Sequence, residues 1–161
     1  MLNPKSERNK YLTFPVEIGV FLESGGDIHV LDLFSLVPVK YSLYGSPAAG
    51  LITRWHKSGV YGDPPHTQKY CIGILKLKLK NTTPETIEVS RSVFDSWSMH
   101  LYYGEYMIMT ADMEVYSPMI ARTYVWDKPP VDGMQRCREL YMARKIPTVH
   151  GSGYLMEFGV A

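Results

Sequence analysis

The residues that decide the fold are 71–80, CIGILKLKLK, and 85–94, ETIEVSRSVF. In both segments apolar and polar residues alternate, which is the period of a β-strand with one buried face. An antiparallel pairing that sets Leu77 opposite Val89 brings the two apolar faces together. A shift by one residue would turn a whole set of side chains to the wrong face. The sequence therefore predicts a β-hairpin with a loop over Asn81–Glu85.

Further strands are expected on both sides of this hairpin, because alternating or β-branched segments are separated by Gly, Pro, Asn and Asp. The pattern predicts an all-β chain, a single-domain antiparallel β-sandwich or open barrel of about nine or ten strands. Residues 1–10 are expected to form a flexible N-terminal arm and residues 11–161 the domain. The other expected strands are residues 11–22, 28–34, 39–44, 51–61, 98–103, 107–116, 119–126, 135–146 and 154–160.

Some of these strands carry more specific signals. Ser24-Gly25-Gly26-Asp27 is a turn signal that predicts a hairpin, and Pro15 predicts an edge position or a strand that starts after it. In residues 107–115 the Met, Ala and Val side chains are expected on one face and the polar ones on the other. Residues 134–145 fit either a helix or a strand, and we assign them as strand.

The overall charge and the motifs exclude several classes of protein. The chain has 17 Lys and Arg against 16 Asp and Glu, so its net charge of +1 provides no general field for nucleic acid or a membrane. Since no signal peptide or membrane span is evident, we expect a cytoplasmic protein without a membrane partner. Cys71 and Cys137 form no metal or redox motif and are expected as reduced thiols. The histidines lack metal-ligand spacing, so we expect no metal and no cofactor.

The charges are unevenly distributed along the chain. Lys69, Lys76, Lys78 and Lys80 form a basic row, whereas the segment from Glu85 to Glu114 contains six acidic residues and Arg91. Adjacent strands with these charges are expected to form ion pairs across the solvent-exposed face of a sheet. A lysine row also discourages pairing with the edges of other sheets.

Four segments carry a family resemblance: FPVEIGVF (14–21), FSLVPVKYSLYGSPAAGLITRW (34–55), EVSRSVFD (88–95) and YMIMTADMEV (106–115). In this order they resemble a family of archaeal proteins known as the domain of unknown function numbered 432. The resemblance covers most of the chain. It implies an archaeal origin and no established activity, and it supplies no catalytic residues.

One candidate ligand site follows the predicted hairpin. The predicted register turns Arg91 inward, where its guanidinium would need an internal carboxylate or an anionic ligand, unless it lies at the sheet margin with its head in water. Asp95, Trp97 and His100 follow closely and could line a small-molecule site with it, or could form an ordinary turn. No Ser-His-Asp arrangement can be identified from this spacing.

A second candidate is Arg54-Trp55-His56 on a predicted strand, where charged and aromatic groups alternate. Such a pattern could contact single-stranded nucleic acid, although an exposed strand face with one buried Trp explains it better. The surplus of 12 Tyr and 9 Met has a different implication, because both types are enriched at protein interfaces. We therefore expect a homodimer.

The first functional interpretation is a non-enzymatic binding or assembly module that acts through a protein partner or a small molecule. The second is a small enzyme or metal-dependent pocket protein that uses Arg91, Asp95 and His100. The third is a nucleic-acid-binding protein, which the near-zero net charge disfavours. An enzyme should bring titratable side chains together in a concave pocket, whereas a module should leave them scattered.

Overall fold

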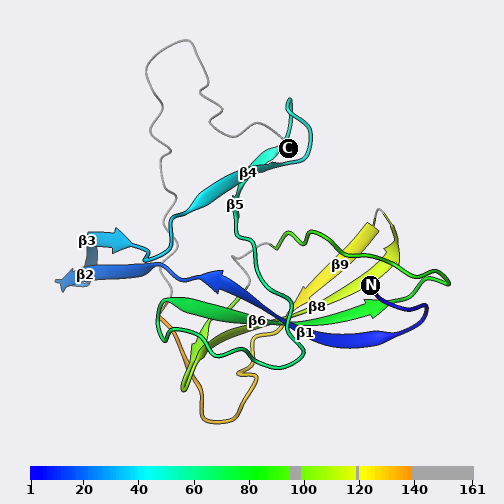
Figure 1. Ribbon diagram of the computed structural model, residues 1–161. Coiled ribbons are helices and arrows are strands. Elements are labelled where there is room, and N and C mark those ends of the chain that lie inside the picture. Colours follow the sequence, from blue (N-terminus) through cyan, green and yellow to red (C-terminus); the bar gives the residue numbers. More distant parts are fainter. Residues whose placement is uncertain (95–98, 119, 139–161) are drawn as a thin grey trace.

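The computed structural model describes residues 1–94, 99–118 and 120–138, which form ten β-strands and no helix (Figure 1). The prediction of an all-β chain with about nine or ten strands is confirmed. The strand expected at 154–160 and most of that expected at 135–146 lie outside the described residues. The strands are β1 (Glu7–Pro15), β2 (Ile18–Ser24), β3 (Asp27–Phe34), β4 (Lys40–Tyr44), β5 (Leu51–Trp55), β6 (Ile72–Asn81), β7 (Tyr102–Tyr103), β8 (Met107–Ser117), β9 (Ile120–Val125) and β10 (Gln135–Arg136).

Six of these strands form one main sheet in the order β1-β6-β8-β7-β10, and β9 also pairs with β8. The long strand β8 has β6 on one side, while β7 and β9 pair with different stretches of its other side. The pairing of β6 with β8 is parallel, and every other pairing in this sheet is antiparallel. The sheet is therefore mixed, which corrects the expectation of purely antiparallel strands.

The predicted hairpin between residues 71–80 and 85–94 is wrong. Strand β6 pairs with β1 on one edge, where Leu77 is opposite Lys10, and with β8 on the other, where Leu77 is opposite Ala111. Neither edge of β6 is left for the segment that follows it. Parallel strands need a long connection, and residues 82–106 provide it between β6 and β8.

The described residues of this connection that precede β7 pack on one face of the sheet, and this packing makes the main hydrophobic core. Its Ile87 and Met99 are buried, and Val89 and Phe94 pack against the same cluster. The sheet contributes alternate residues to this core, which are Leu75, Leu77, Leu79, Ala111, Met113 and Val115. The predicted face of residues 107–115 is thus confirmed, because the apolar side chains of β8 are directed into the core. Ile87 and Val89 also face inward, but they pack on the sheet and do not extend it.

The opposite face of the sheet is apolar at one end only. There Ile74, Tyr102 and Ile108 form a smaller buried cluster, against which Tyr11, Tyr106 and Met134 pack. Toward the carboxyl end of β6 the same face carries Lys76, Lys78 and Lys80, which are half-buried or exposed. This part of the sheet remains open to solvent.

The N-terminal residues do not form the flexible arm that the sequence suggests. Leu2 is buried, and it forms a β-bridge with Ile87 through two backbone hydrogen bonds of 2.7 and 2.9 Å. Strand β1 already begins at Glu7. Residues 7–10 are polar and resemble a loop in composition, but they form a strand because they pair with an edge of β6.

Two hairpins project from the main sheet (Figure 1). In the first, β2 pairs with β3 through the predicted turn, in which Gly25 and Gly26 have positive φ angles of 61° and 89°. These angles suit the tight turns that connect twisted antiparallel strands, and glycine adopts them without steric cost. Pro15 ends β1, which is an edge strand as predicted, so the chain leaves the sheet there. The second hairpin consists of β4 and β5.

The side chain of Asn81 joins three segments at the end of β6. Its Nδ2 donates to the carbonyl oxygens of Leu2, Asn3 and Glu85 at 3.3, 3.0 and 2.7 Å. Its Oδ1 accepts hydrogen bonds from the backbone N–H and the hydroxyl of Thr83 at 2.9 and 2.8 Å. Asn81 is only 1% exposed, so water cannot replace these partners.

We expect Asn81→Asp to lower the free energy of unfolding by about 3 kcal/mol or more, because a carboxylate oxygen would face three carbonyl oxygens in a buried site. Urea denaturation measures this loss. The matched control is Asn3→Asp at an exposed neighbouring position, which should change the stability by no more than about 0.5 kcal/mol. Equal effects of the two substitutions would contradict the structural role of Asn81.

Candidate binding sites

Arg91 is exposed and does not belong to a strand, so the predicted inward orientation is wrong. The register that turned it inward required residues 85–94 to pair with β6, whose edges are both occupied. Within the described part of the chain Arg91 makes no hydrogen bond or ion pair. The positions of Asp95 and Trp97 lie outside the described residues.

His100 belongs to a polar cluster whose other members the sequence did not indicate: Tyr102, Asp127 and Arg136. The Nη2 of Arg136 lies 2.7 Å from Nδ1 of His100, and Nε2 of the same ring lies 3.5 Å from Oδ1 of Asp127. The hydroxyl of Tyr102 donates to the same oxygen at 3.1 Å, and Nη1 of Arg136 lies 3.4 Å from it. The same Nη2 also lies 3.3 Å from Nε2 of His100, so the guanidinium contacts both ring nitrogens.

Through these contacts the cluster connects β10 and the loop after β9 with the start of β7. Both ring nitrogens of His100 are engaged, so the imidazole has no free nitrogen to take a proton from a substrate. The cluster therefore fits a structural role better than general base catalysis. The sequence indicates that Asp127 lies in a loop, because Lys128-Pro129-Pro130 follows it, but it does not indicate that Asp127 contacts His100.

The residues Arg54, Trp55 and His56 lie at the end of β5 and just beyond it. Arg54 forms an ion pair of 2.7 Å with Glu17, and the ammonium group of Lys40 lies 5.7 Å from the centre of the Trp55 ring. Partial burial lowers the pKa of His56, which favours its neutral form. The ion pair of Arg54 and the neutral form of His56 reduce the positive charge that the segment could offer to a phosphate.

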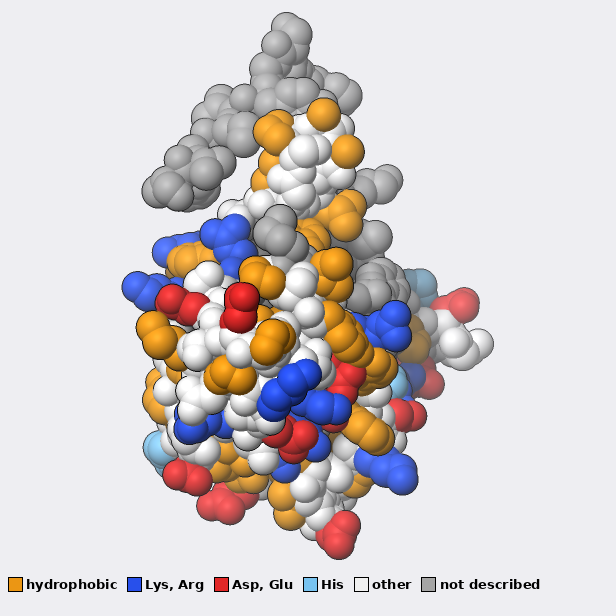
Figure 2. Space-filling model, turned by 90° about the vertical axis from the view of Figure 1, so that its right-hand side faces the viewer, with side chains coloured by type: hydrophobic (Ala, Val, Ile, Leu, Met, Phe, Trp, Pro, Cys, Tyr) orange, Lys and Arg blue, Asp and Glu red, His pale blue; other side chains and the backbone are white. Residues whose placement is uncertain are grey.

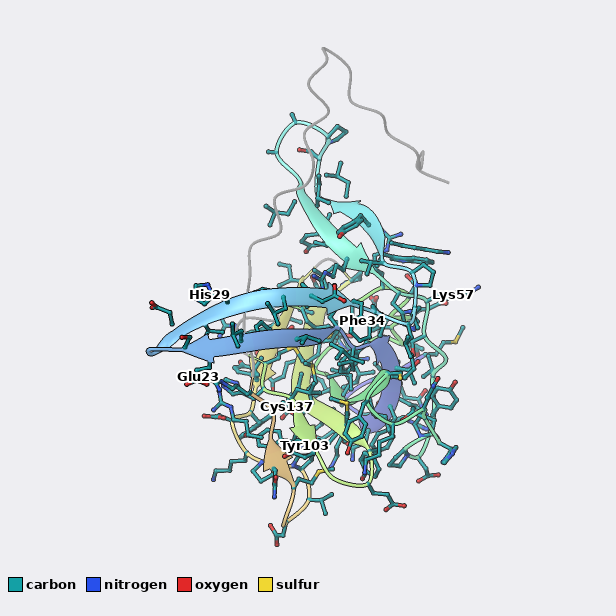
Figure 3. The ribbon with its side chains drawn as sticks, turned by 90° about the vertical axis from the view of Figure 1, so that its left-hand side faces the viewer. Glu23, His29, Phe34, Lys57, Tyr103 and Cys137 are labelled. Carbon is teal, nitrogen blue, oxygen red and sulfur yellow. The ribbon has the colours of Figure 1, made fainter. Side chains whose placement is uncertain are left out.

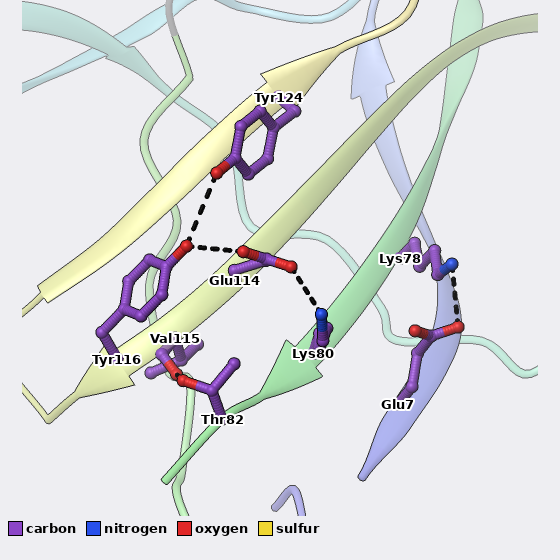
Figure 4. A network of polar contacts seen from close by, with 8 residues as sticks. All are labelled: Glu7, Lys78, Lys80, Thr82, Glu114, Val115, Tyr116 and Tyr124. Carbon is purple, nitrogen blue, oxygen red and sulfur yellow. Dashed lines mark hydrogen bonds and ion pairs between the residues drawn. The ribbon is translucent and has the colours of Figure 1, made fainter. Parts of the chain in front are cut away.

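The open face of the main sheet carries the ion pairs expected from the lysine row. The register places Lys80 between Glu7 and Glu114, and it places Arg122 beyond Glu114. Charges of opposite sign thus alternate across four strands. Lys80 pairs with Glu114 at 2.8 Å, and Lys78 reaches diagonally to Glu7 at 2.9 Å (Figure 4). Exposed pairs of this kind stabilise a protein weakly, so the face can exchange them for contacts with a ligand.

Two tyrosines continue this network on β8 and β9 (Figure 4). The hydroxyl of Tyr116 donates to Glu114 at 2.5 Å and lies 3.5 Å from the hydroxyl of Tyr124. The hydrogen bond with Glu114 raises the pKa of Tyr116, because it stabilises the protonated phenol. Hydrogen bonds with Tyr116 and with Arg122 lower the pKa of Tyr124.

The two projecting hairpins expose a large share of their apolar side chains. Figure 2 shows charged side chains of both signs and hydrophobic ones over the body, whereas the described part that projects upward carries hydrophobic side chains. Figure 3 labels Glu23 and His29 near the tip of the β2–β3 hairpin, where Glu23 forms an ion pair of 3.1 Å with Arg138. Leu51 and Ile52 are neighbours on β5, so they point to opposite faces, yet they are 68% and 61% exposed. The other large apolar residues that are exposed on these hairpins are Val20, Leu22, Ile28, Leu31, Phe34, Tyr41, Tyr44 and Trp55.

Tyr124 is expected to ionise at a lower pH than an ordinary tyrosine, and Tyr116 at a higher pH. An alkaline titration followed by the ultraviolet absorbance of tyrosinate should therefore contain one early step, which Tyr124→Phe removes. Tyr41→Phe, at an exposed position on β4, is the control and should leave that step in place. An early step that persists in Tyr124→Phe would contradict the assignment.

Comparisons with known proteins complete this description. No curated protein and no solved structure matches the chain. Among the described residues no helix could cross a membrane, and no three His, Cys, Asp or Glu side chains lie close enough together to hold a metal ion. Within the same residues Cys71 and Cys137 form no disulfide with each other. The family described as "Protein of unknown function (DUF432)" matches residues 1–160, so the chain belongs to the DUF432 family.

Proposed function

We propose that the protein is a cytoplasmic assembly module that forms a homodimer through the β2–β3 and β4–β5 hairpins. The observation that carries this proposal is the exposure of ten large apolar side chains on these two hairpins: Val20, Leu22, Ile28, Leu31, Phe34, Tyr41, Tyr44, Leu51, Ile52 and Trp55. Scattered apolar residues are normal on a surface, but a concentration on two projecting elements marks an interaction site.

The stability of the hairpins supports the proposal. Among the strands that the structure describes, each strand of a hairpin pairs only with the other strand of that hairpin. A two-stranded hairpin is marginally stable in water unless a third strand or another layer covers its apolar face. A partner that packs on the hairpins would remove this apolar surface from water, which is the main favourable term in association.

The charges of the hairpins favour a second copy of the chain as that partner. Residues 18–34 contain Glu23, Asp27 and Asp32 and no Lys or Arg. Residues 40–57 contain Lys40, Arg54 and Lys57 and no Asp or Glu. Within the chain Glu23 pairs with Arg138 and Arg54 pairs with Glu17, which leaves Asp27 and Asp32 on the first hairpin and Lys40 and Lys57 on the second for contacts with a partner. The β2–β3 hairpin of one copy therefore complements the β4–β5 hairpin of another, and a two-fold axis allows both contacts to form at once.

The alternatives have less support. A nucleic-acid surface at Arg54 is weakened by the ion pair of this residue with Glu17. A catalytic site at Arg91 and His100 is weakened by the exposure of Arg91 and by the occupied nitrogens of His100.

Sedimentation equilibrium at micromolar concentration should give twice the mass of one 18.4 kDa chain. Leu31→Ser combined with Ile52→Ser should shift the protein to a monomer, because it removes two of the most exposed apolar side chains from the hairpins. The control is Ile120→Ser on β9, which is 62% exposed and lies outside the hairpins, and it should leave the dimer intact. A monomeric parent protein would overturn the proposal.

A charge exchange tests the pairing of the two hairpins. Asp27→Lys with Asp32→Lys should weaken dimerisation by about tenfold or more, because like charges would then face each other. Adding Lys40→Asp and Lys57→Asp to the same chain should restore it, and native mass spectrometry can follow both steps. If the combined variant remained as weak as the first, a partner other than the β4–β5 hairpin would be indicated.

A further inference from the structure

We infer a second binding site, for a neutral saccharide, on the open face of the main sheet. A shallow hollow of about 340 Å³ lies there, lined by residues of β1, β6 and β8 and by the residue that follows β9. Its floor is formed by the sheet itself, and its lining includes Asn9, Lys76, Lys78, Thr110, Asp112 and Trp126. The hollow lies on the main sheet and not on the hairpins, so it does not depend on the proposed dimer.

The strand register brings these residues together. Asn9, Lys78 and Asp112 are neighbours across β1, β6 and β8, and Lys76 and Thr110 are neighbours in the next row. Trp126 directly follows β9 and lies two residues beyond Tyr124. Alternate residues of a strand share a face, so both rings lie on the same face of the sheet. Residues far apart in the sequence therefore line one surface.

Several polar groups in the hollow have unused hydrogen-bonding capacity. The hydroxyl oxygen of Thr110 is buried and has no hydrogen-bond partner among the described residues. The side chains of Asn9, Lys76 and Asp112 also make no hydrogen bond or ion pair within the described part of the chain. Buried polar groups are nearly always hydrogen-bonded in folded proteins, so the unpaired hydroxyl indicates that a bound molecule completes the site.

The charge balance of the hollow defines the kind of ligand. Two ammonium groups, from Lys76 and Lys78, lie beside two carboxylates, from Glu7 and Asp112. A phosphate or another anion would be repelled by the carboxylates, and Lys78 is already paired with Glu7. A neutral molecule with many hydroxyl groups can instead donate to the carboxylates and accept from Lys76, Asn9 and Thr110.

The aromatic residues add the second element of saccharide recognition. Trp126 lines the hollow and is 49% exposed, and Tyr124, which pairs with the lining residue Asp112, is 40% exposed. The C–H face of a sugar ring is apolar and can pack on such rings, while the hydroxyl groups at its rim reach the polar side chains. Charged rows of this kind are unfavourable in the core of a protein–protein interface, which argues against a protein ligand here.

Isothermal titration calorimetry with maltopentaose, cellopentaose and mannopentaose tests this site in the full chain. We expect at least one of these neutral oligosaccharides to bind at millimolar concentration or below, and inorganic phosphate not to compete. Trp126→Ala should weaken binding by about tenfold or more, since the stacking surface is lost. The control is Tyr70→Ala, at an aromatic residue that is 50% exposed and lies outside both the hollow and the hairpins, and it should leave saccharide binding unchanged.

Thr110→Val provides a second readout, because it removes the unpaired hydroxyl and keeps the shape of the side chain. Binding should weaken while the melting temperature stays the same or rises. Three results would overturn the inference: no heat of binding with any of the three oligosaccharides, equal binding by Trp126→Ala, or displacement by phosphate. Sedimentation of the same samples reports on the dimer separately, so the two proposals can fail independently.

Discussion

The side chain of Asn81 determines where the central strand ends, and the arrangement of the main sheet depends on that position. Its amide holds the carbonyl groups of Leu2, Asn3 and Glu85, while its oxygen holds Thr83. These bonds turn the chain away from β6 and bring the N-terminal segment against the same point. A buried amide with every partner in place specifies one arrangement, because each lost hydrogen bond would leave an unsatisfied polar group.

The path of the chain after Asn81 explains why the sheet has one covered and one partly open face. The described residues between β6 and β7 pack on one face before the chain reaches the parallel strand β8, and Ile87 and Met99 complete the core there. The lysine row of β6 is thereby left on the other face, opposite the acidic residues of β1 and β8. The charged surface and the hollow beside Trp126 are consequences of this crossover.

Much of the local structure was predictable. The period of two assigned the strands, the Gly25-Gly26 turn specified the first hairpin, and the alternation in residues 107–115 identified the buried face of β8. The strands that pair with β6 could not be predicted from the sequence. Glu88 fits opposite Lys78 in a hairpin, but Asp112 and Glu114 occupy equivalent positions opposite Lys78 and Lys80 in the sheet. Local patterns cannot distinguish these pairings, because both satisfy the same alternation of charge and hydrophobicity.

The candidate sites also combine features that the sequence indicates with features that only the tertiary structure decides. By itself the sequence determined which residues prefer strands, which faces are apolar and which segments turn, because these properties depend on neighbours within a few residues. It identified His100 but not Asp127 and Arg136, and it identified the lysines but not their position beside Thr110 and Trp126. Only the tertiary structure decided which strands are neighbours, which arginine is exposed and which polar groups share a hollow. Such contacts depend on competition between distant segments for the two edges of one strand, and that competition is settled by the packing of the whole chain.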